Sequence, residues 1–120
     1  KLPRTLDADR ALQLLDGARE DLKWGSNRVF SVAGNKMFAI LDFVDKDGGL
    51  AFKVGSELFL GYVDRPGIRP APYLARAHWI VMARPYPMKA AELREALVRS
   101  HQLVVARLPK RQRLGLVLDA

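Results

Sequence analysis

Ser100 and His101 are the side chains best suited to nucleophilic chemistry, which needs a hydroxyl beside an imidazole that accepts its proton. They are adjacent in a run with helical periodicity, where neighbouring side chains point about 100° apart, so a Ser–His pair is not expected. We expect the Ser100 hydroxyl to bond to the carbonyl of Ala96, and His101 to pack at the edge of a buried face. The only other histidine is His78, and the chain has no cysteine, so no metal-ligand spacing is present. The sequence predicts no catalytic residues, no cofactor and no enzymatic activity.

Acidic side chains near the N-terminus offer a second kind of chemistry, the binding of a hard cation. Asp9, Asp16 and Glu20 share one stripe of a predicted helix, with Asp7 and Asp21 close by. Oxygen-only clusters of this kind bind calcium or magnesium weakly. The stripe lies opposite an apolar face, which favours an ordinary solvent-facing side. We expect no metal site, and a weak metal-binding domain is the least favoured alternative.

The basic residues are the most informative group. The chain has 20 Lys and Arg against 13 Asp and Glu, a net charge of +7, and all of the excess lies after residue 64. This balance favours polyanionic partners such as nucleic acid, although a solvated surface with no partner would have the same composition. The candidates for phosphate contact come from predicted turns, loops, strands and the segment after the last helix: Lys36, Lys53, Arg65, Arg69, Arg76, Lys110, Arg111 and Arg113.

Aromatic side chains interleave with these cations and offer stacking or apolar contacts to a partner. The candidates are Phe38, Tyr73, His78 and Trp79. With Ile40, they would equally serve a protein- or peptide-binding face, for which the basic half of the chain favours an acidic protein or peptide. For Trp79 the core is the favoured location, because it alternates within an apolar strand.

The elements that position these residues follow from the apolar spacing. Apolar residues from Ala8 to Ala18 recur at helical intervals after a capping Thr5, which predicts a helix with Gly17 near its end as the stop. A loop at residues 24–27 follows. Residues 28–43 form a predicted hairpin around a two-residue turn, Gly34-Asn35.

With Ala33 opposite Lys36, the hairpin's two faces follow by alternation. One face is the predicted core: Phe30, Val32, Met37, Ala39, Leu41 and Phe43. The other is mixed and partly covered: Val29, Ser31, Lys36, Phe38, Ile40 and Asp42, with Lys53 of the next strand on the same outer face.

Later elements alternate between the two periodicities. We predict a strand at 50–54, a short helix at 56–63, a long helix at 89–108 and a basic segment at 110–113. Residues 73–83 form a predicted extended run, either one long strand or a short piece followed by a strand centred on Trp79 to Met82. Helix, antiparallel strands and helix in this order predict one α+β domain, an antiparallel sheet with an N-terminal and a C-terminal helix packed on one face. No run approaches the length of a membrane span and no secretory leader opens the chain, so we expect a soluble, cytoplasmic protein, a monomer or weak dimer.

Several short segments, in order and spacing, resemble the MmcQ/YjbR family over roughly residues 5–111, with 112–120 as a tail. They are Leu15-Asp16-Gly17-Ala18-Arg19-Glu20, Lys23-Trp24-Gly25, Gly34-Asn35-Lys36-Met37-Phe38-Ala39, Leu50-Ala51-Phe52-Lys53, Pro70-Ala71-Pro72-Tyr73-Leu74, His78-Trp79 and Ser100-His101-Gln102-Leu103-Val104-Val105-Ala106-Arg107-Leu108-Pro109-Lys110.

The chain departs from the family pattern at three positions. The family usually has Pro at Asp16, a second Gly at Asn35 and an aromatic residue, commonly Tyr, at His101. The resemblance implies a CyaY-like fold, also grouped with secretion-chaperone-like folds, and DNA binding through a double-wing arrangement of hairpins. We therefore expect weakly specific contact with the DNA backbone, with a peptide-binding module as the alternative.

Overall fold

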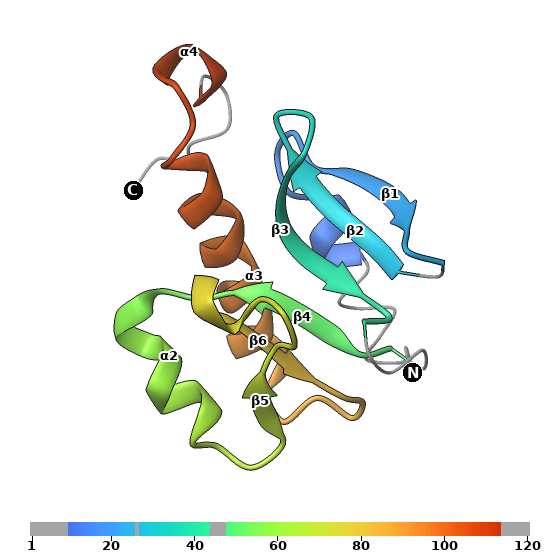
Figure 1. Cartoon of the computed structure of the whole chain (residues 1–120), viewed down its shortest axis with the longest axis vertical. Coiled ribbons are helices and arrows are strands. Elements are labelled where there is room, and N and C mark those ends of the chain that lie inside the picture. Colours follow the sequence, from blue (N-terminus) through green and yellow to red (C-terminus); the bar gives the residue numbers. More distant parts are fainter. Residues whose placement is uncertain (1–9, 26, 44–47, 114–120) are drawn as a thin grey trace.

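The computed structural model describes residues 10–25, 27–43 and 48–113. They form one six-stranded antiparallel sheet and the helices that pack on it (Figure 1). The strands lie in the order β1-β2-β3-β4-β6-β5 and are β1 (Arg19–Lys23), β2 (Asn27–Val32), β3 (Lys36–Leu41), β4 (Leu50–Lys53), β5 (Ile68–Pro70) and β6 (Trp79–Met82). The helices are α2 (Ser56–Val63), the short 3-10 helix η1 (Ala75–Ala77), α3 (Ala90–Val105) and α4 (Lys110–Arg113). This is the predicted α+β architecture.

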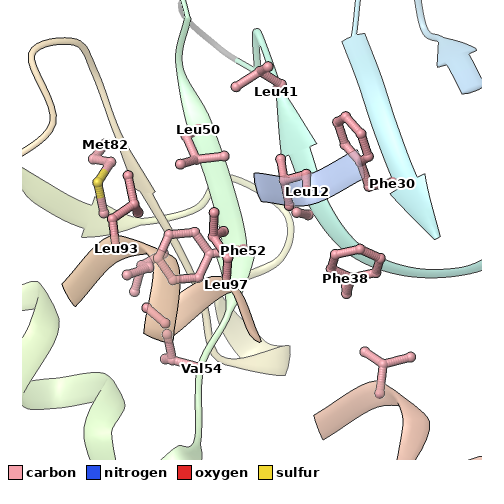
Figure 2. Packing of buried hydrophobic residues seen from close by; sticks show 14 of the residues in the cluster. Leu12, Phe30, Phe38, Leu41, Leu50, Phe52, Val54, Met82, Leu93 and Leu97 are labelled. Carbon is pink, nitrogen blue, oxygen red and sulfur yellow. The ribbon is translucent and has the colours of Figure 1, made fainter. Parts of the chain in front are cut away.

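The main hydrophobic core lies between the sheet and α3. Rings from three neighbouring strands, Phe30, Phe38 and Phe52, lie on the side of the sheet that faces Leu93 and Leu97 of α3 (Figure 2). All three rings are 1% exposed or less, and burying a side chain of this size stabilises the fold by about 1.5–3 kcal/mol. The apolar spacing of α3 therefore fixes the helix over the centre of the sheet.

The β2–β3 turn is one residue longer than the sequence predicted. Val32 pairs with Lys36, which leaves Ala33, Gly34 and Asn35 in the turn instead of Gly34-Asn35 alone. Ala33 and Gly34 both have positive φ, 50° and 89°. The prediction was wrong because Ala33, a residue that rarely adopts positive φ, does so here.

A β-bulge then corrects the register. The pairing shifts between Phe30 and Ser31. On the side away from the turn, from Phe30 back to Arg28, each residue has its predicted partner on β3. The extra residue turns Phe38 toward the main core, whereas Met37 packs on the opposite face, the reverse of the prediction. Phe43 also packs on that second face and not in the predicted core.

The N-terminal helix is shorter than predicted. Residues 10–13 are helical, and Leu12 is fully buried in the main core, but residues 14–17 turn away and β1 follows. Gly17 has φ 70°, a conformation that ends a helix and that glycine adopts without strain. The apolar spacing continued to Ala18 because that residue packs against the same core from outside the helix. The part of this prediction before residue 10 lies outside the described residues.

The chain between β5 and β6 crosses the second face of the sheet. The predicted extended run at 73–83 is η1 followed by β6, which begins only at Trp79. Ala71 and partly buried Leu74 pack on this face, so it carries its own buried cluster. The members of this second cluster are Val29, Ile40, Ala51, Ala71, Trp79 and Val81.

The remaining elements match the sequence in kind. The short helix α2 spans the predicted residues, and α3 covers residues 90–105 of the predicted 89–108. Residues 110–113, predicted as an irregular basic segment, form the one-turn helix α4. In the described part of the chain, no helix is both long and apolar enough to cross a bilayer.

The sheet has two edge strands, β1 and β5. The sequence of β1 is Arg-Glu-Asp-Leu-Lys, and β5 has three residues and ends at Pro70. Both edges are thus short, and one is highly charged.

Candidate functional site

Four of the predicted phosphate-contacting residues lie toward one end of the molecule. Lys36 follows the β2–β3 turn and is paired with Val32, so its side chain shares the sheet face that α3 covers. The turn and α4 both project toward the same end of the long axis (Figure 1). We call Lys36, Lys110, Arg111 and Arg113 the cationic end.

Little negative charge accompanies the cationic end. The sequence has no Asp or Glu from residue 96 to residue 118. Arg107, exposed in the link between α3 and α4, is a further cation there that sequence analysis did not single out. Among the ion pairs formed by the described residues, none includes Arg107 or a member of the cationic end. These positive charges are therefore available to an anionic partner.

Arg65 has a structural role. Its two terminal nitrogens donate to both carboxylate oxygens of Glu92 at 2.7 and 3.1 Å, and Nη2 also donates to the Pro87 carbonyl at 3.1 Å. The hydrogen bond from Arg65 lowers the pKa of Glu92, and in return raises the pKa of Arg65. Arg65 therefore links the loop after α2 to the first turn of α3. Both of its terminal nitrogens already donate to acceptors within the fold.

Lys53 is also engaged and does not lie on the same face as Lys36. It is paired with Trp79 on the second face, and its Nζ donates to the Ala77 carbonyl at 2.6 Å. Partial burial lowers the pKa of Lys53, with the positive charge of Arg107 adding to the effect. This lysine fastens η1 to the sheet.

Arg69 and Arg76 do not join the cationic end. Arg69 lies on the edge strand β5, toward the opposite end of the long axis, and Arg76 lies in η1 between the two ends (Figure 1). Both side chains are exposed. The eight candidate cations thus form one group of four, two residues engaged within the fold and two separate exposed residues.

The four candidate aromatic residues divide by burial. Phe38 and Trp79 are 0% and 3% exposed, so their rings are closed to a partner; for Trp79 this is the favoured core location. Tyr73 is fully exposed. His78 is partly buried, with its ring 5.5 Å from that of Phe59 in an edge-on contact.

An apolar groove of about 410 Å³ opens beside Tyr73, at the margin of the second cluster. The sequence did not predict this groove, because Trp24 lies in a predicted loop and Met37 and Phe43 lie on the predicted core face. The sequence feature that could have indicated the groove is an aromatic residue in each of two separate loops, Trp24 and Tyr73. The groove is lined by Trp24, Asn27, Met37, Phe43, Pro72, Tyr73 and Leu74.

Ser100 closes a gap in the sheet. Its hydroxyl donates to the Phe38 carbonyl at 2.7 Å and accepts from the Lys53 amide at 3.1 Å, where the paired residues of β3 and β4 end. The predicted bond to Ala96 is therefore wrong: the fully buried hydroxyl bridges two strands. This serine is held as a structural link and not as a nucleophile.

His101 is a structural link to the N-terminal turn. It is 1% exposed, more buried than predicted, with its ring edge-on to Phe38 at 5.2 Å. Its Nε2 lies 2.6 Å from the Asp16 carbonyl and its Nδ1 lies 2.8 Å from the Gln102 amide nitrogen. The tautomer with the proton on Nε2 satisfies both contacts, donating to one and accepting from the other.

The acidic stripe predicted near the N-terminus does not form on a helix. Asp16 lies in the turn before β1, whereas Glu20 and Asp21 lie on β1, and the described residues contain no cluster of three metal-ligating side chains. Glu20 accepts from Arg28 Nε at 2.6 Å, and this bond lowers its pKa. Asp7 and Asp9 lie outside the described residues.

Comparison with family models and solved structures gives a consistent result. A family model described as YjbR matches residues 13–103. A crystal structure from Deinococcus radiodurans, with a domain of the family DUF419, superposes with a TM-score of 0.78 at 24% identity, covering 92% of this chain and 85% of that one. A Pseudomonas syringae protein is 26% identical; its crystal structure gives a TM-score of 0.68, covering 86% of this chain and 99% of that one.

A comparison with curated proteins finds matches over a short segment. Tyrosine recombinase XerC from three strains of Pseudomonas aeruginosa is 95% identical over 21 residues, which are 18% of this chain. The match spans only 7% of the recombinase, so it concerns one short segment.

Proposed function

Because the chain belongs to the YjbR family, with the α+β fold of its solved relatives, we propose that it binds the phosphate backbone of DNA through the cationic end. The observation that carries the proposal is the placement of Lys36 and α4 toward one end of the molecule, without ion-pair partners among the described residues. Arg and Lys on a hairpin turn and a helix end are suited to phosphate oxygens. The proposed function is binding and not catalysis, because Ser100 and His101 are both engaged within the fold.

Weak sequence specificity follows from the same geometry. The cationic end has flexible lysine and arginine side chains, and α4 has only four residues, too short to serve as a base-reading helix in the major groove. The binding free energy would come mainly from the release of counterions. Affinity should therefore depend strongly on salt and little on base sequence.

Fluorescence anisotropy with a labelled DNA duplex at several salt concentrations tests this proposal. With about four phosphates neutralised, log K should fall with log[salt] at a slope of about −4. Replacing Lys36, Lys110, Arg111 and Arg113 by Gln should abolish most of the binding and flatten the slope.

A matched control removes the same charge elsewhere, by Gln substitution of the exposed residues Arg69, Arg76, Arg84 and Arg94. This control should bind DNA nearly as well as the wild type. Equal weakening by both variants would show a general charge effect with no defined site. Absence of binding by the wild type at low salt would refute the proposal.

A second candidate function, binding of a protein or peptide, is favoured by a different observation, the apolar groove. The described residues that line the groove are uncharged, and none of them belongs to the cationic end. The two functions can therefore be tested with separate variants.

A further inference from the structure

The groove is held in place by the fold while its rim stays open. Met37, Phe43 and Leu74 line it and also pack against the second buried cluster, so its floor is fixed. Trp24 and Tyr73 form the exposed part of the lining, with 62% and 100% of their surface accessible. The sheet thus presents two aromatic rings beside a rigid apolar surface.

The backbone at both rings is in an unfavourable conformation. Trp24 has φ 50° and Tyr73 has φ 67°, in the left-handed region where bulky side chains are rare. Glycine adopts this conformation without steric cost. Ala33, Asp42 and His78 have the same backbone conformation, so it does not mark a site by itself. What points to a ligand is that two exposed aromatic rings from separate loops line one groove.

The openness of the groove distinguishes between classes of ligand. Sites for small molecules bury most of the ligand surface, typically 70–90% of it. A ring as exposed as that of Tyr73 leaves one side of the groove uncovered. A chain-like ligand that lies across the groove fits this shape better than an enclosed small molecule.

The chemistry of the lining narrows the ligand further. Among the described residues that line the groove none is charged, and the Asn27 carboxamide and the Tyr73 hydroxyl are their polar side-chain groups. Grooves lined with aromatic rings recognise proline-containing segments, whose extended backbone is already ordered and exposes its carbonyls to donors such as a carboxamide. The uncharged lining complements an uncharged segment. The net charge of +7 acts at longer range and favours a partner protein that is acidic overall.

We propose that this groove binds an uncharged, proline-containing segment of an acidic protein, with Trp24 and Tyr73 contacting the proline rings and Asn27 donating to a backbone carbonyl. The inference deepens the second candidate function and is independent of DNA binding. It assigns the groove to a partner class rather than to one particular protein.

A labelled peptide tests the inference. The probe has an uncharged core of alternating proline and leucine pairs with two glutamates at each end, and its binding is followed by anisotropy. For the wild type, tryptophan emission should also shift to the blue, because Trp24 is exposed whereas Trp79 is buried. Trp24→Gly and Tyr73→Gly should each weaken binding by roughly tenfold or more.

These variants also separate binding from folding. Glycine relieves the left-handed backbone at either position, so the melting temperature should stay the same or rise while binding is lost. Leu60→Ala, on the exposed side of α2 with 75% of the side chain accessible, should bind like the wild type.

Four results would overturn the inference. The first two are no binding of the wild type at millimolar peptide, and glycine variants that both bind the peptide as tightly as the wild type does. The others are wild-type binding of a peptide with alanine in place of proline as tight as that of the proline peptide, or a blue shift of the tryptophan emission with free indole in place of the peptide. The last result would assign the groove to a small molecule. Duplex DNA serves as the independent probe, since Trp24→Gly should leave its binding unchanged.

Discussion

At the scale of single residues, Ser100 shows how one hydroxyl completes a sheet. The Phe38 carbonyl and the Lys53 amide, on neighbouring strands, both bond to it rather than to each other. Buried backbone groups without a partner are costly, so the helix supplies what the strands lack. The sequence indicated that Ser100 lies among apolar positions, but local periodicity cannot show that its partners are residues 38 and 53.

Ser100→Ala should lower the free energy of unfolding by about 2–4 kcal/mol, because it leaves a buried carbonyl and a buried amide without their partner. Urea denaturation followed by circular dichroism measures the change. Ser31→Ala is the matched control: Ser31 is 1% exposed, and its hydroxyl has no hydrogen-bond partner among the described residues.

The control should unfold within about 0.5 kcal/mol of the wild type, or be more stable. Equal losses in the two variants would show that the Ser100 bridge contributes nothing specific.

At the scale of elements, the local sequence pattern predicted which segments are helices and which are strands, in most cases. It did not predict the turns and the bulge that connect and align them. Gly34-Asn35 signalled a turn, yet its length depended on Ala33 accepting a positive φ and on a bulge further along the hairpin. That bulge decides which face Phe38 occupies. In the same way, the groove depends on left-handed φ at Trp24 and Tyr73, which no residue type there announces.

The Arg65–Glu92 pair joins the loop after α2 to α3, and it should make stability depend on pH. The pKa of Glu92 lies below its ordinary value of 4.5 in the folded protein, chiefly through the hydrogen bond from Arg65. The pair therefore stabilises the fold above the unfolded pKa, and its contribution is lost as the pH falls through the lower folded pKa. Since both side chains are more than a third exposed, at 37% and 40%, the contribution at pH 7 is about 0.5–1 kcal/mol.

Glu92→Gln should remove this contribution at pH 7, and its effect should shrink as the pH falls below 4.5 and through the lower folded pKa, as measured by urea denaturation at a series of pH values. Glu95→Gln is the comparison, because Glu95 lies 3.8 Å from Arg99 in a more exposed pair. It should cost only about 0.3 kcal/mol. A Glu92→Gln effect that stayed the same at every pH, down to acid unfolding, would contradict the role of the charge.

At the scale of the whole molecule, the fold divides the basic residues into those that bond within the protein and those that remain exposed to a partner. Sequence analysis identified the excess charge and its location, but not which cations are engaged. Arg65 and Lys53 bond within the fold, whereas the cationic end has no ion-pair partner among the described residues. That division depends on contacts between residues far apart in the sequence, such as Arg65 with Glu92.

The net charge of +7 should also make thermal stability depend on salt. Like charges repel in the compact state, and salt screens them, so raising NaCl from about 10 to about 300 mM should raise the melting temperature by about 2–5 °C. The variant with Gln at the four positions of the cationic end should show a smaller rise. A melting temperature that falls with salt would contradict this account.

The free edge at β1 has a consequence for concentrated solutions. An unpaired strand is where further chains add to a sheet and where fibrils begin. Two copies joined antiparallel about Asp21 would set Arg19 against Lys23 and one aspartate against the other, so like charges would face across the new ladder. The opposite edge offers only three residues and ends in a proline. In that register, the charge pattern of β1 opposes the addition of a second copy at this edge.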